Sequence, residues 1–348
     1  MVSYSLEELD KDRWTILENE AQNLSILQTY SWAEVLKSIG TEPRFLMVID
    51  NGSPLLGLLM FRSRFISEFV CGYEARKGPI VVPDVNESVF SFFVSALKDV
   101  LKKESALYLY WEPPLHPNLD QCLLDQKFLT IPSATFVVDL RLPLESLWKR
   151  LEKRARWGVK KAQKMDITVS EAKNWEGWKR YREIYVYENY HKRVRPRSLK
   201  LHKSIYQHLF PEERAKLFVA RYHGKTIAGS LFLATNFEMI YYEGASDARF
   251  LKFQPNNIIQ WHAISWAKQQ GIKYYDLGGV LRNPDRRHAL YGVYMFKRQW
   301  GGKLHRYDSF ALNKFYVIGR NLSLRNTAIR QLYYSLERLR MIQRFDRI

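Results

Sequence analysis

The pattern of apolar and polar residues is clearest between Gln254 and Gly302. Apolar side chains recur at helical spacing after Pro255, and this periodicity predicts a helix that ends at Gly271. The apolar run at 272–277 predicts a short strand that leads into Gly278-Gly279. A polar loop follows, and then a second amphipathic helix that carries Tyr291. This order of elements is typical of an α/β layer and not of a helix bundle.

The same criteria predict helices and strands along the rest of the chain. Helices are expected over residues 6–21, 28–40, 86–103, 143–164, 175–190 and 198–209, with a short helix or loop at 116–127. Strands are expected over residues 44–50, 55–64, 77–82, 106–111, 135–140, 166–171, 216–222, 225–234, 238–245 and 303–312. Asn51-Gly52 and His223-Gly224 are the expected turns of two hairpins.

An internal repeat indicates two related domains. The stretches FLMVIDNGSPLLGLLMF and LFVARYHGKTIAGSLFL share one pattern, and the pairs Gly52/Gly224 and Gly57/Gly229 lie at the same offset of 172 residues. A helix and an apolar strand follow in each half. The expected fold class is therefore α/β (α+β), with two tandem acetyltransferase-like (GNAT) domains that have mixed central sheets. The expected domains are 1–142 and 143–315, with a basic helical tail at 316–348.

Composition and charge narrow the class of protein. The formal net charge is +18, from 54 Lys and Arg against 36 Asp and Glu, so an anionic partner is expected; a merely soluble basic protein is the alternative. Since 46% of the residues are hydrophobic, wholesale disorder is excluded. No apolar run approaches the roughly 18–20 residues that span a bilayer. The start of the chain is unlike a secretory signal, and Cys71 and Cys122 show no metal or redox spacing, so a cytoplasmic location is expected.

Three motifs in the second half of the chain resemble one family. They are P-N-N-x-x-Q-W from Pro255, Y-Y-D-L-G-G from Tyr274 and Y-x-F-K from Tyr294, followed by a pair of glycines. They resemble the Fem transferases, which use aminoacyl-tRNA to build the peptide cross-bridge of bacterial cell-wall precursors on two tandem acetyltransferase-like domains. The resemblance covers most of residues 1–315. It implies that an aminoacyl group moves from aminoacyl-tRNA to a side-chain amine of a muramyl-peptide precursor, either nucleotide-linked or lipid-linked, without a bound cofactor.

The resemblance also implies catalytic residues. Phe296-Lys297 stands at the family's Phe-Lys pair, whose lysine is thought to lie near the aminoacyl ester. Acyl transfer to an amine passes through a tetrahedral oxyanion, and a fixed cation nearby lowers that barrier. An exposed helix lysine is the alternative interpretation. Glu112, before Pro113, stands where the family has an aspartate before a proline, and it is a candidate general base or a structural carboxylate.

Family members grip the diphosphate of a nucleotide-sugar peptide with a lysine after a W-A-x-V segment and an arginine before a proline. Lys37 follows the segment that begins at Trp32, displaced by one position, and Arg195 precedes Pro196. A guanidinium group suits phosphate oxygens. Lys77 begins a K-G-P strand start that the family shares. The remaining substrate-binding candidates are Tyr242, Asp276, Gly278 and Gly279. A solvated loop, a turn, a loop cap or strand packing is the structural alternative for each of these residues.

The densest positive charge follows residue 143. Apolar residues such as Leu147 and Val159 interleave with it, so the stretch is expected to pack while it presents its charge. We expect it to hold the acceptor stem of tRNA through phosphate contacts, although a solvated face is the alternative. The candidate tRNA-binding residues are Lys153, Arg154, Arg156, Lys160, Lys161 and Lys164.

Other functions stay open on the sequence alone. The tail is basic and amphipathic, so it either lies on an anionic membrane, at the inner face, or packs against the body. One alternative enzyme is an acyl-CoA-dependent N-acyltransferase, although the stretch between Ala245 and Asn256 lacks a glycine to cradle the coenzyme A pyrophosphate. A non-catalytic RNA- or membrane-binding protein is the other alternative. The eight histidines show no metal spacing, so no metal site is expected.

Overall fold

The computed structural model of the chain describes residues 4–8, 10–64, 71–83, 85–115 and 128–312. They form two compact units. Among the described residues, the first unit comprises those up to Ala134, a short stretch at 207–209 and residues 305–312, and the second comprises the segments between them. The units thus divide between Ala134 and Thr135, whereas the sequence predicts a boundary after residue 142. The elements expected at 116–127 and 316–348 lie outside the described residues.

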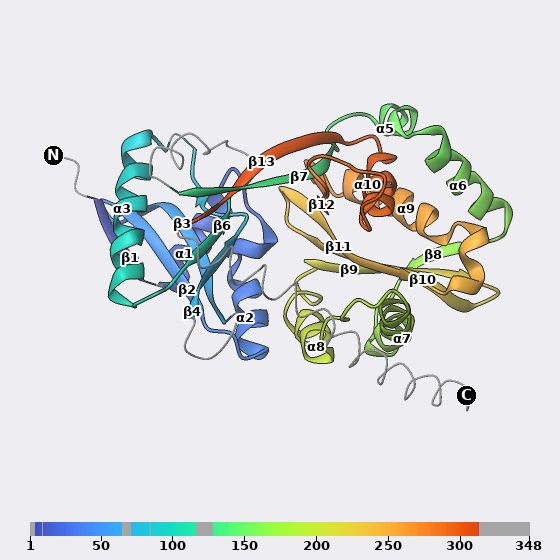
Figure 1. The fold of residues 1–348 in the computed structure, drawn as a ribbon, viewed down its shortest axis with the longest axis horizontal. Coiled ribbons are helices and arrows are strands. Elements are labelled where there is room, and N and C mark those ends of the chain that lie inside the picture. Colours follow the sequence, from blue (N-terminus) through green and yellow to red (C-terminus); the bar gives the residue numbers. More distant parts are fainter. Residues whose placement is uncertain (1–3, 9, 65–70, 84, 116–127, 313–348) are drawn as a thin grey trace. The chain divides into compact units, whose positions relative to one another are not determined.

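The first unit is a mixed sheet with helices on both of its faces (Figure 1). Its strands are β1 (Tyr4–Glu8), β2 (Pro43–Asp50), β3 (Ser53–Arg64), β4 (Cys71–Arg76), β5 (Ile80–Val81), β6 (Leu109–Glu112) and most of β13 (Lys303–Ala311). Its helices are α1 (Lys11–Glu20), η1 (Ile26–Gln28), α2 (Tyr30–Ser38) and α3 (Glu87–Lys103). The strands pair in the order β1-β2-β3-β4-β6-β13, and the β4–β6 pair is parallel while the others are antiparallel.

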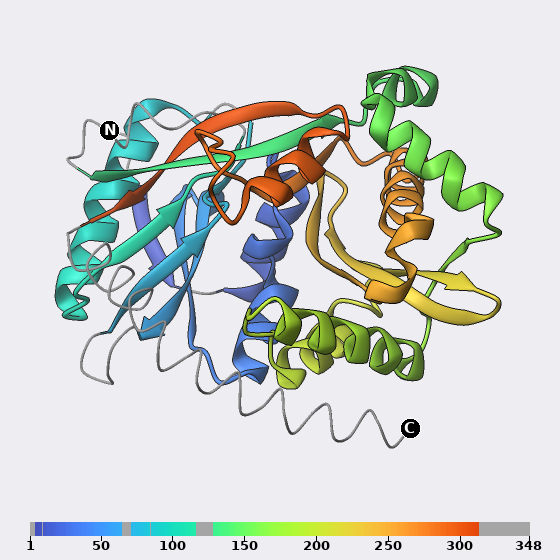
Figure 2. The same ribbon diagram turned by 45° about the vertical axis from the view of Figure 1, so that its right-hand side comes forward.

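The second unit repeats this plan. Its strands are β7 (Leu129–Asp139) from Thr135 onward, β8 (Thr168–Glu171), β9 (Ala215–Tyr222), β10 (Lys225–Ala234), β11 (Glu238–Ser246) and β12 (Tyr274–Gly279). Its helices are α5 (Leu144–Arg150), α6 (Lys153–Lys164), α7 (Trp175–His191), α8 (Leu199–His208), η2 (Ala248–Phe253), α9 (Pro255–Gln269) and α10 (Tyr291–Arg298). The order is β7-β12-β11-β10-β9-β8, with only β11 and β12 parallel among these pairs. Figures 1 and 2 show α9 on one face of this sheet and α7 on the other.

The structure confirms the fold class and the repeat. The β2–β3 and β9–β10 hairpins turn at the predicted pairs, and Asn51, Gly52, His223 and Gly224 all adopt positive φ. In each unit, a helix lies in the sequence between the two strands of the parallel pair: α3 in the first unit and α9 in the second. Gly57 and Gly229 occupy the same place in the two copies. A Cβ on Gly57 would lie 2.5 Å from Leu17 of α1, and one on Gly229 would lie 2.5 Å from Tyr181 of α7.

The expected helix over 6–21 is wrong in its first part. Residues Tyr4–Glu8 form β1, which pairs antiparallel with β2, and the helix begins only at Lys11. Asp10 marks the change, because its side chain accepts hydrogen bonds from the free amides of Asp12 and Arg13 and so caps α1. Pairing with β2, distant in sequence, overrides the local helical pattern.

The basic helix expected over 143–164 is broken in two. The α5 helix ends at Arg150, and α6 begins at Lys153. The Arg156 guanidinium donates hydrogen bonds to the backbone oxygens of Lys149, at 2.9 Å, and Leu151. These bonds satisfy carbonyl groups that the end of α5 leaves without helical partners.

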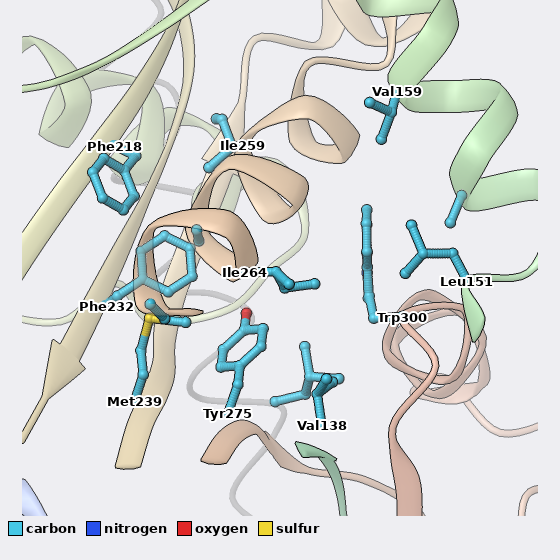
Figure 3. Close-up of a cluster of buried hydrophobic side chains, with 14 of the residues drawn as sticks. Val138, Leu151, Val159, Phe218, Phe232, Met239, Ile259, Ile264, Tyr275 and Trp300 are labelled. Atoms are coloured by element: carbon cyan, nitrogen blue, oxygen red, sulfur yellow. The ribbon is translucent and has the colours of Figure 1, made fainter. Parts of the chain in front are cut away.

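The core of the second unit fixes the end of α10. Figure 3 shows Trp300 among Leu151, Val159 and Ile264, and the Trp300 side chain is only 1% exposed. Phe296 of α10 meets the Trp300 ring edge-on, with ring centroids 6.0 Å apart. A buried indole so close to the helix leaves α10 little freedom to shift, because an interior packed to this density resists displacement.

The close approach of α7 to the sheet predicts a cost for a single added methyl group. Gly229→Ala should lower the free energy of unfolding by about 1–3 kcal/mol, because its Cβ would overlap the buried Tyr181 ring. Urea denaturation measures this change. Gly292→Ala is the control: its Cβ meets nothing within 4 Å, so no loss of stability is expected. Equal stability of Gly229→Ala and the wild-type protein would contradict the packing described.

Candidate functional site

The two strands of the parallel pair in the second unit part from each other. The β11–β12 register runs from Glu238 and Tyr274 to Ile240 and Asp276, whereas β11 continues along β10 to Ser246. In the first unit, the equivalent β4–β6 register runs to the last residues of both strands. The carboxyl ends of parallel strands are where α/β folds place their ligands. The point where β11 and β12 part is therefore the candidate site.

Asp276 holds the bend at this point. Its side chain is 2% exposed and accepts hydrogen bonds from the Thr135 hydroxyl and, at 2.8 Å, from the Gly278 amide. The pairing of β12 with β7 shifts its register between Asp276 and Gly279. The carboxylate thus supports an irregular turn by satisfying an amide that regular pairing would otherwise engage.

Lys297 reaches this turn from α10. Its Nζ donates a hydrogen bond to the Gly279 backbone oxygen at 3.0 Å. Gly278 has a φ of +77°, and a Cβ there would lie 3.2 Å from the Lys297 Nζ. Both the backbone conformation and the close amine therefore require glycine at this position. Three residues of the predicted site, Lys297, Gly278 and Gly279, are brought into contact.

The surroundings change the acidity of this amine. Burial lowers the pKa of Lys297 to about 8, although the Asp276 carboxylate acts in the opposite direction. Desolvation dominates because it disfavours the charged ammonium, and the nearby carboxylate only partly compensates. The amine is mostly protonated at pH 7 and largely neutral a little above pH 8. A lysine with so low a pKa, directed at the carboxyl end of a strand, is typical of functional sites.

Aromatic side chains surround the lysine helix. The Phe296 ring lies 6.4 Å from the Tyr241 ring of β11, centroid to centroid. Burial raises the pKa of Tyr241 well above its ordinary value, so its hydroxyl stays protonated. The next residue, Tyr242, lies where the register between β10 and β11 shifts, so it has no partner on β10. Its ring lies under the Arg197 guanidinium at 4.2 Å, and burial raises its pKa to about 12.

A buried polar network lies beside Tyr242. The Glu243 carboxylate lies 3.2 Å from Arg197 Nε and 2.7 Å from His202 Nε2. The Tyr181 hydroxyl donates a hydrogen bond to it at 3.2 Å. Local sequence patterns do not reveal this network. An acidic residue within the apolar strand at 238–245 was the one signal for it, and its partners come from α7, α8 and the loop between them.

The network anchors the loop that carries Arg195. Arg182 Nη1, which can only donate, lies 2.7 Å from His202 Nδ1 and 3.0 Å from the Arg197 carbonyl oxygen. His202 therefore carries its proton on Nε2, toward Glu243. The Arg197 amide also donates to the Tyr185 hydroxyl. Arg195 itself is exposed, so the loop is fixed through Arg197 while Arg195 stays accessible.

The remaining candidate catalytic and substrate-binding residues belong to the first unit. Glu112 ends β6, lies 3.4 Å from Arg76 Nη1 and accepts a hydrogen bond from the Tyr307 hydroxyl at 3.2 Å. Arg76 is the register partner of Glu112 on β4 and also pairs with Glu74. The Glu112 carboxylate is thus held in an ion-paired cluster. Lys77, directly after β4, is buried and has a φ of +55°.

The α2 helix carries the last two of these residues. Trp32 is buried in the first unit, and its amide is capped by the Thr29 side chain. Lys37 pairs with Glu34 at 2.7 Å, and this hydrogen bond raises the pKa of Lys37. The Lys37 amine lies 5.5 Å from the Tyr30 ring. Lys37 is therefore a fixed cation, and Trp32 supports the helix that presents it.

The predicted tRNA-binding residues lie on α6 and share a basic surface. Five of them have exposed or partly exposed side chains directed away from the core: Lys153, Arg154, Lys160, Lys161 and Lys164. Arg156 is the exception, since its guanidinium is bound to the backbone at the α5–α6 break. The predicted positive surface is therefore formed by one side of a single helix.

The fold and the parted strands define an acetyltransferase-like protein with two such units. Residues 145–298 match a family model for the acetyltransferase (GNAT) domain. FemX, as a solved structure, has a TM-score of 0.75 at 18% identity over 91% of this chain and 100% of its own. A tandem GNAT protein from the clavulanic acid biosynthesis pathway has a TM-score of 0.50 at 10% identity, over 89% and 97% of the two chains. At these identities the likeness shows the fold.

Similarity to curated proteins at the level of sequence covers a limited part of the chain. The Lipid II:glycine glycyltransferase of Staphylococcus haemolyticus is 32% identical over 102 residues, which is 29% of this chain and 24% of that protein. The chain thus spans about a quarter of the length of this curated relative. The sequence similarity is thus confined to part of the chain, whereas the likeness to FemX in fold extends over most of it.

No helix in the described part of the chain combines the length and the apolar character needed to cross a bilayer. Within the same residues, no group of three or more His, Cys, Asp or Glu side chains is arranged to hold a metal ion.

The burial of Lys297 predicts an unusual titration. Its amine should titrate near pH 8, and Asp276→Asn should lower that pKa further, because the carboxylate is the group that raises it. Between pH 8 and pH 10.5, the unfolded chain binds more protons at this amine than the folded chain does. The free energy of unfolding therefore increases with pH in this window, because the cost of burying the charged amine is lost. Titration of the lysine side chains by NMR, with Lys297→Arg to assign the signal, measures the pKa. A midpoint above pH 10 would rule out the described environment.

The network around Glu243 predicts a loss of stability. Glu243→Gln should lower the free energy of unfolding by roughly 3 kcal/mol, the lower end of the cost of breaking a buried pair, because Arg197 is partly exposed. Glu145→Gln removes a carboxylate that pairs with Lys149 on the surface, and less than about 1 kcal/mol is expected from it. Urea denaturation of both variants compares the two pairs, and equal small losses would show that the network is not structural.

Proposed function

We propose that the chain is an aminoacyltransferase that moves an aminoacyl group from aminoacyl-tRNA to a side-chain amine of a peptidoglycan precursor peptide. The single observation that carries the proposal is Lys297, a partly buried amine with a pKa of about 8 at the point where β11 and β12 part. Similarity to proteins named Lipid II:glycine glycyltransferase supports the reaction class and favours glycine and a lipid-linked acceptor.

Lys297 can supply what this reaction needs. The acceptor amine attacks the ester carbonyl, and a C–N bond forms while the carbonyl oxygen becomes an oxyanion. The C–O bond to the ribose then breaks, and the ribose oxygen takes the proton that the attacking nitrogen loses. A protonated Lys297, the major form at pH 7, stabilises the oxyanion by its charge. Its hydrogen bond to the Gly279 oxygen fixes the position of that charge before the reaction.

The parted strands offer a place for the ester end of the donor. An extended ligand can follow the edge of β11 beyond Ile240, where the register with β12 has ended. Gly278 and Gly279 present backbone without side chains on the β12 side, and Phe296 and Tyr241 supply apolar surface nearby. In this proposal the carbonyl carbon of the ester lies within reach of the Lys297 amine.

The basic surface of α6 is proposed to hold the RNA of the donor. The helix is attached to α10 by two bonds, from Arg298 Nε to the Glu152 carboxylate at 2.8 Å and from the Glu152 amide to the Gln299 oxygen at 3.0 Å. Lys297 directly precedes Arg298. Phosphates bound on α6 are therefore held by an element whose position relative to Lys297 is fixed.

The acceptor is proposed to use the remaining predicted residues. Lys37 and Arg195 are fixed or accessible cations suited to the diphosphate that joins the muramyl peptide to its carrier. Lys77, Trp32, Glu112 and Tyr242 remain candidates to bind or support this substrate. Because a lipid carrier keeps its head group at the membrane surface, this proposal puts the protein at the cytoplasmic face of the membrane, at least while it acts.

One structural observation argues against coenzyme A as the donor. The segment after β11 forms η2, and its cap Asp247 accepts a hydrogen bond from the Arg249 amide and pairs with the Arg249 side chain. A coenzyme A pyrophosphate requires free backbone amides at this place. Here one of those amides is already satisfied by an acidic side chain.

Removal of the Lys297 charge should reduce turnover strongly. Lys297→Met should lower kcat by about 10²- to 10³-fold, the cost of losing one oxyanion-stabilising group. Lys297→Arg should recover part of this loss, and its rate relative to the wild-type enzyme should increase as pH rises through 8, because arginine keeps its charge. The assay follows glycyl transfer from charged tRNA to a lipid-linked muramyl peptide.

Lys303→Met provides the matched control, since this lysine is exposed on β13 and should be dispensable. Full activity of a folded Lys297→Met protein would refute the proposed role. Transfer from a coenzyme A thioester, with none from charged tRNA, would refute the proposed donor.

A further inference from the structure

The inner face of α6 is fully used in packing. Ala155, Gly158, Val159 and Ala162 are buried in the core of the second unit. A Cβ on Gly158 would lie 2.2 Å from the Asn257 side chain of α9, so the two helices approach as closely as glycine permits. The orientation of α6, and therefore of its outer face, is fixed by this contact.

The outer face of α6 combines strong positive charge with one large aromatic side chain. Trp157 is 54% exposed and lies in the middle of the helix. The Lys161 amine is 4.8 Å from the centre of its ring. The helix contains no acidic residue from Lys153 to Lys164, and the carboxylate just before it, Glu152, is paired with Arg298.

This combination favours RNA over a membrane as the partner. A helix that lies on a bilayer inserts a continuous apolar face, but the apolar face of α6 is buried against α9. One indole surrounded by cations instead matches the surfaces that bind unpaired nucleotides, where bases stack on aromatic rings and basic groups contact the phosphates. Lysine phosphate contacts alone do not require an exposed tryptophan.

We propose that Trp157 stacks on an unpaired base of the RNA bound by α6, and that this surface therefore prefers RNA with a single-stranded end over a blunt duplex. The inference rests on the proposed function, in which α6 holds the RNA of the donor. It adds a specific role for one residue. The lysines supply affinity for any phosphate backbone, and Trp157 supplies discrimination for a segment whose bases are free to stack.

The test compares two RNA hairpins that share one stem, one blunt and one with a four-nucleotide 3′ overhang. Binding of each hairpin to the full chain is measured by fluorescence anisotropy at fixed salt. The wild-type protein should bind the overhang hairpin more tightly. Trp157→Ala should weaken that binding by about 5- to 150-fold, the range for one lost base stack, and should leave the blunt hairpin unchanged. Trp157→Phe should keep most of the preference, because phenylalanine also offers a ring.

Two control variants separate this inference from the proposed function. The double variant Lys160→Gln/Lys164→Gln should weaken both hairpins alike and reduce the salt dependence of binding. Leu251→Ala removes another exposed apolar side chain, 48% exposed and outside α6, and should change neither affinity.

Each other result has a definite meaning. If the lysine variant weakens binding while Trp157→Ala binds both hairpins like the wild-type protein, the stacking inference is wrong and the phosphate-binding surface stands. If neither variant changes RNA binding, both the stacking inference and the proposed role of α6 in binding the donor RNA are wrong. If Trp157→Ala lowers sedimentation with vesicles of anionic phospholipid and leaves RNA binding intact, the partner of this face is a membrane and the inference is overturned.

Discussion

One buried carboxylate determines the geometry of the candidate site. Asp276 is the last residue of β12 that pairs with β11, and its side chain binds the Gly278 amide and the Thr135 hydroxyl across the bend. The backbone beyond it turns, and the Gly279 oxygen is directed toward Lys297. An ionised group this deeply buried is tolerated only when hydrogen bonds satisfy it. The opening of the strands and the location of the lysine thus have a common origin.

The acidity of Lys297 results from two opposed effects that the fold keeps in balance. Burial removes water from the amine, and the Asp276 carboxylate restores part of the lost stabilisation of its charge. With burial alone the pKa of the amine would be lower still. A fully exposed amine would be a strongly hydrated cation with little influence on a nearby oxygen. The intermediate arrangement keeps a charge that is poorly hydrated, which is the condition under which an electrostatic contact is most effective.

Local sequence patterns were sufficient for most of the fold but not for all of the site. The hairpin turns, the α9–β12 order and the internal repeat depend on neighbouring residues, so they could be predicted. The strand β1 could not, because only its pairing with β2 stabilises it. Lys297 was found through its motif, whereas Glu243 and Arg197 were missed because their partners meet only in three dimensions. The basic loop suggested Arg195 as the important guanidinium group, and the structure shows that Arg197, two residues further on, is the one that is anchored.

The two copies of the fold differ in a way that sets the stoichiometry of the proposed reaction. In the described part of the first unit, β4 and β6 stay paired as far as Arg76 and Glu112, and the arginine side chain bridges their ends. A strand pair closed along its whole length has no free edge for an extended ligand to follow. Duplication of the fold has therefore not duplicated the proposed donor position, and each chain would carry one activated amino acid at a time.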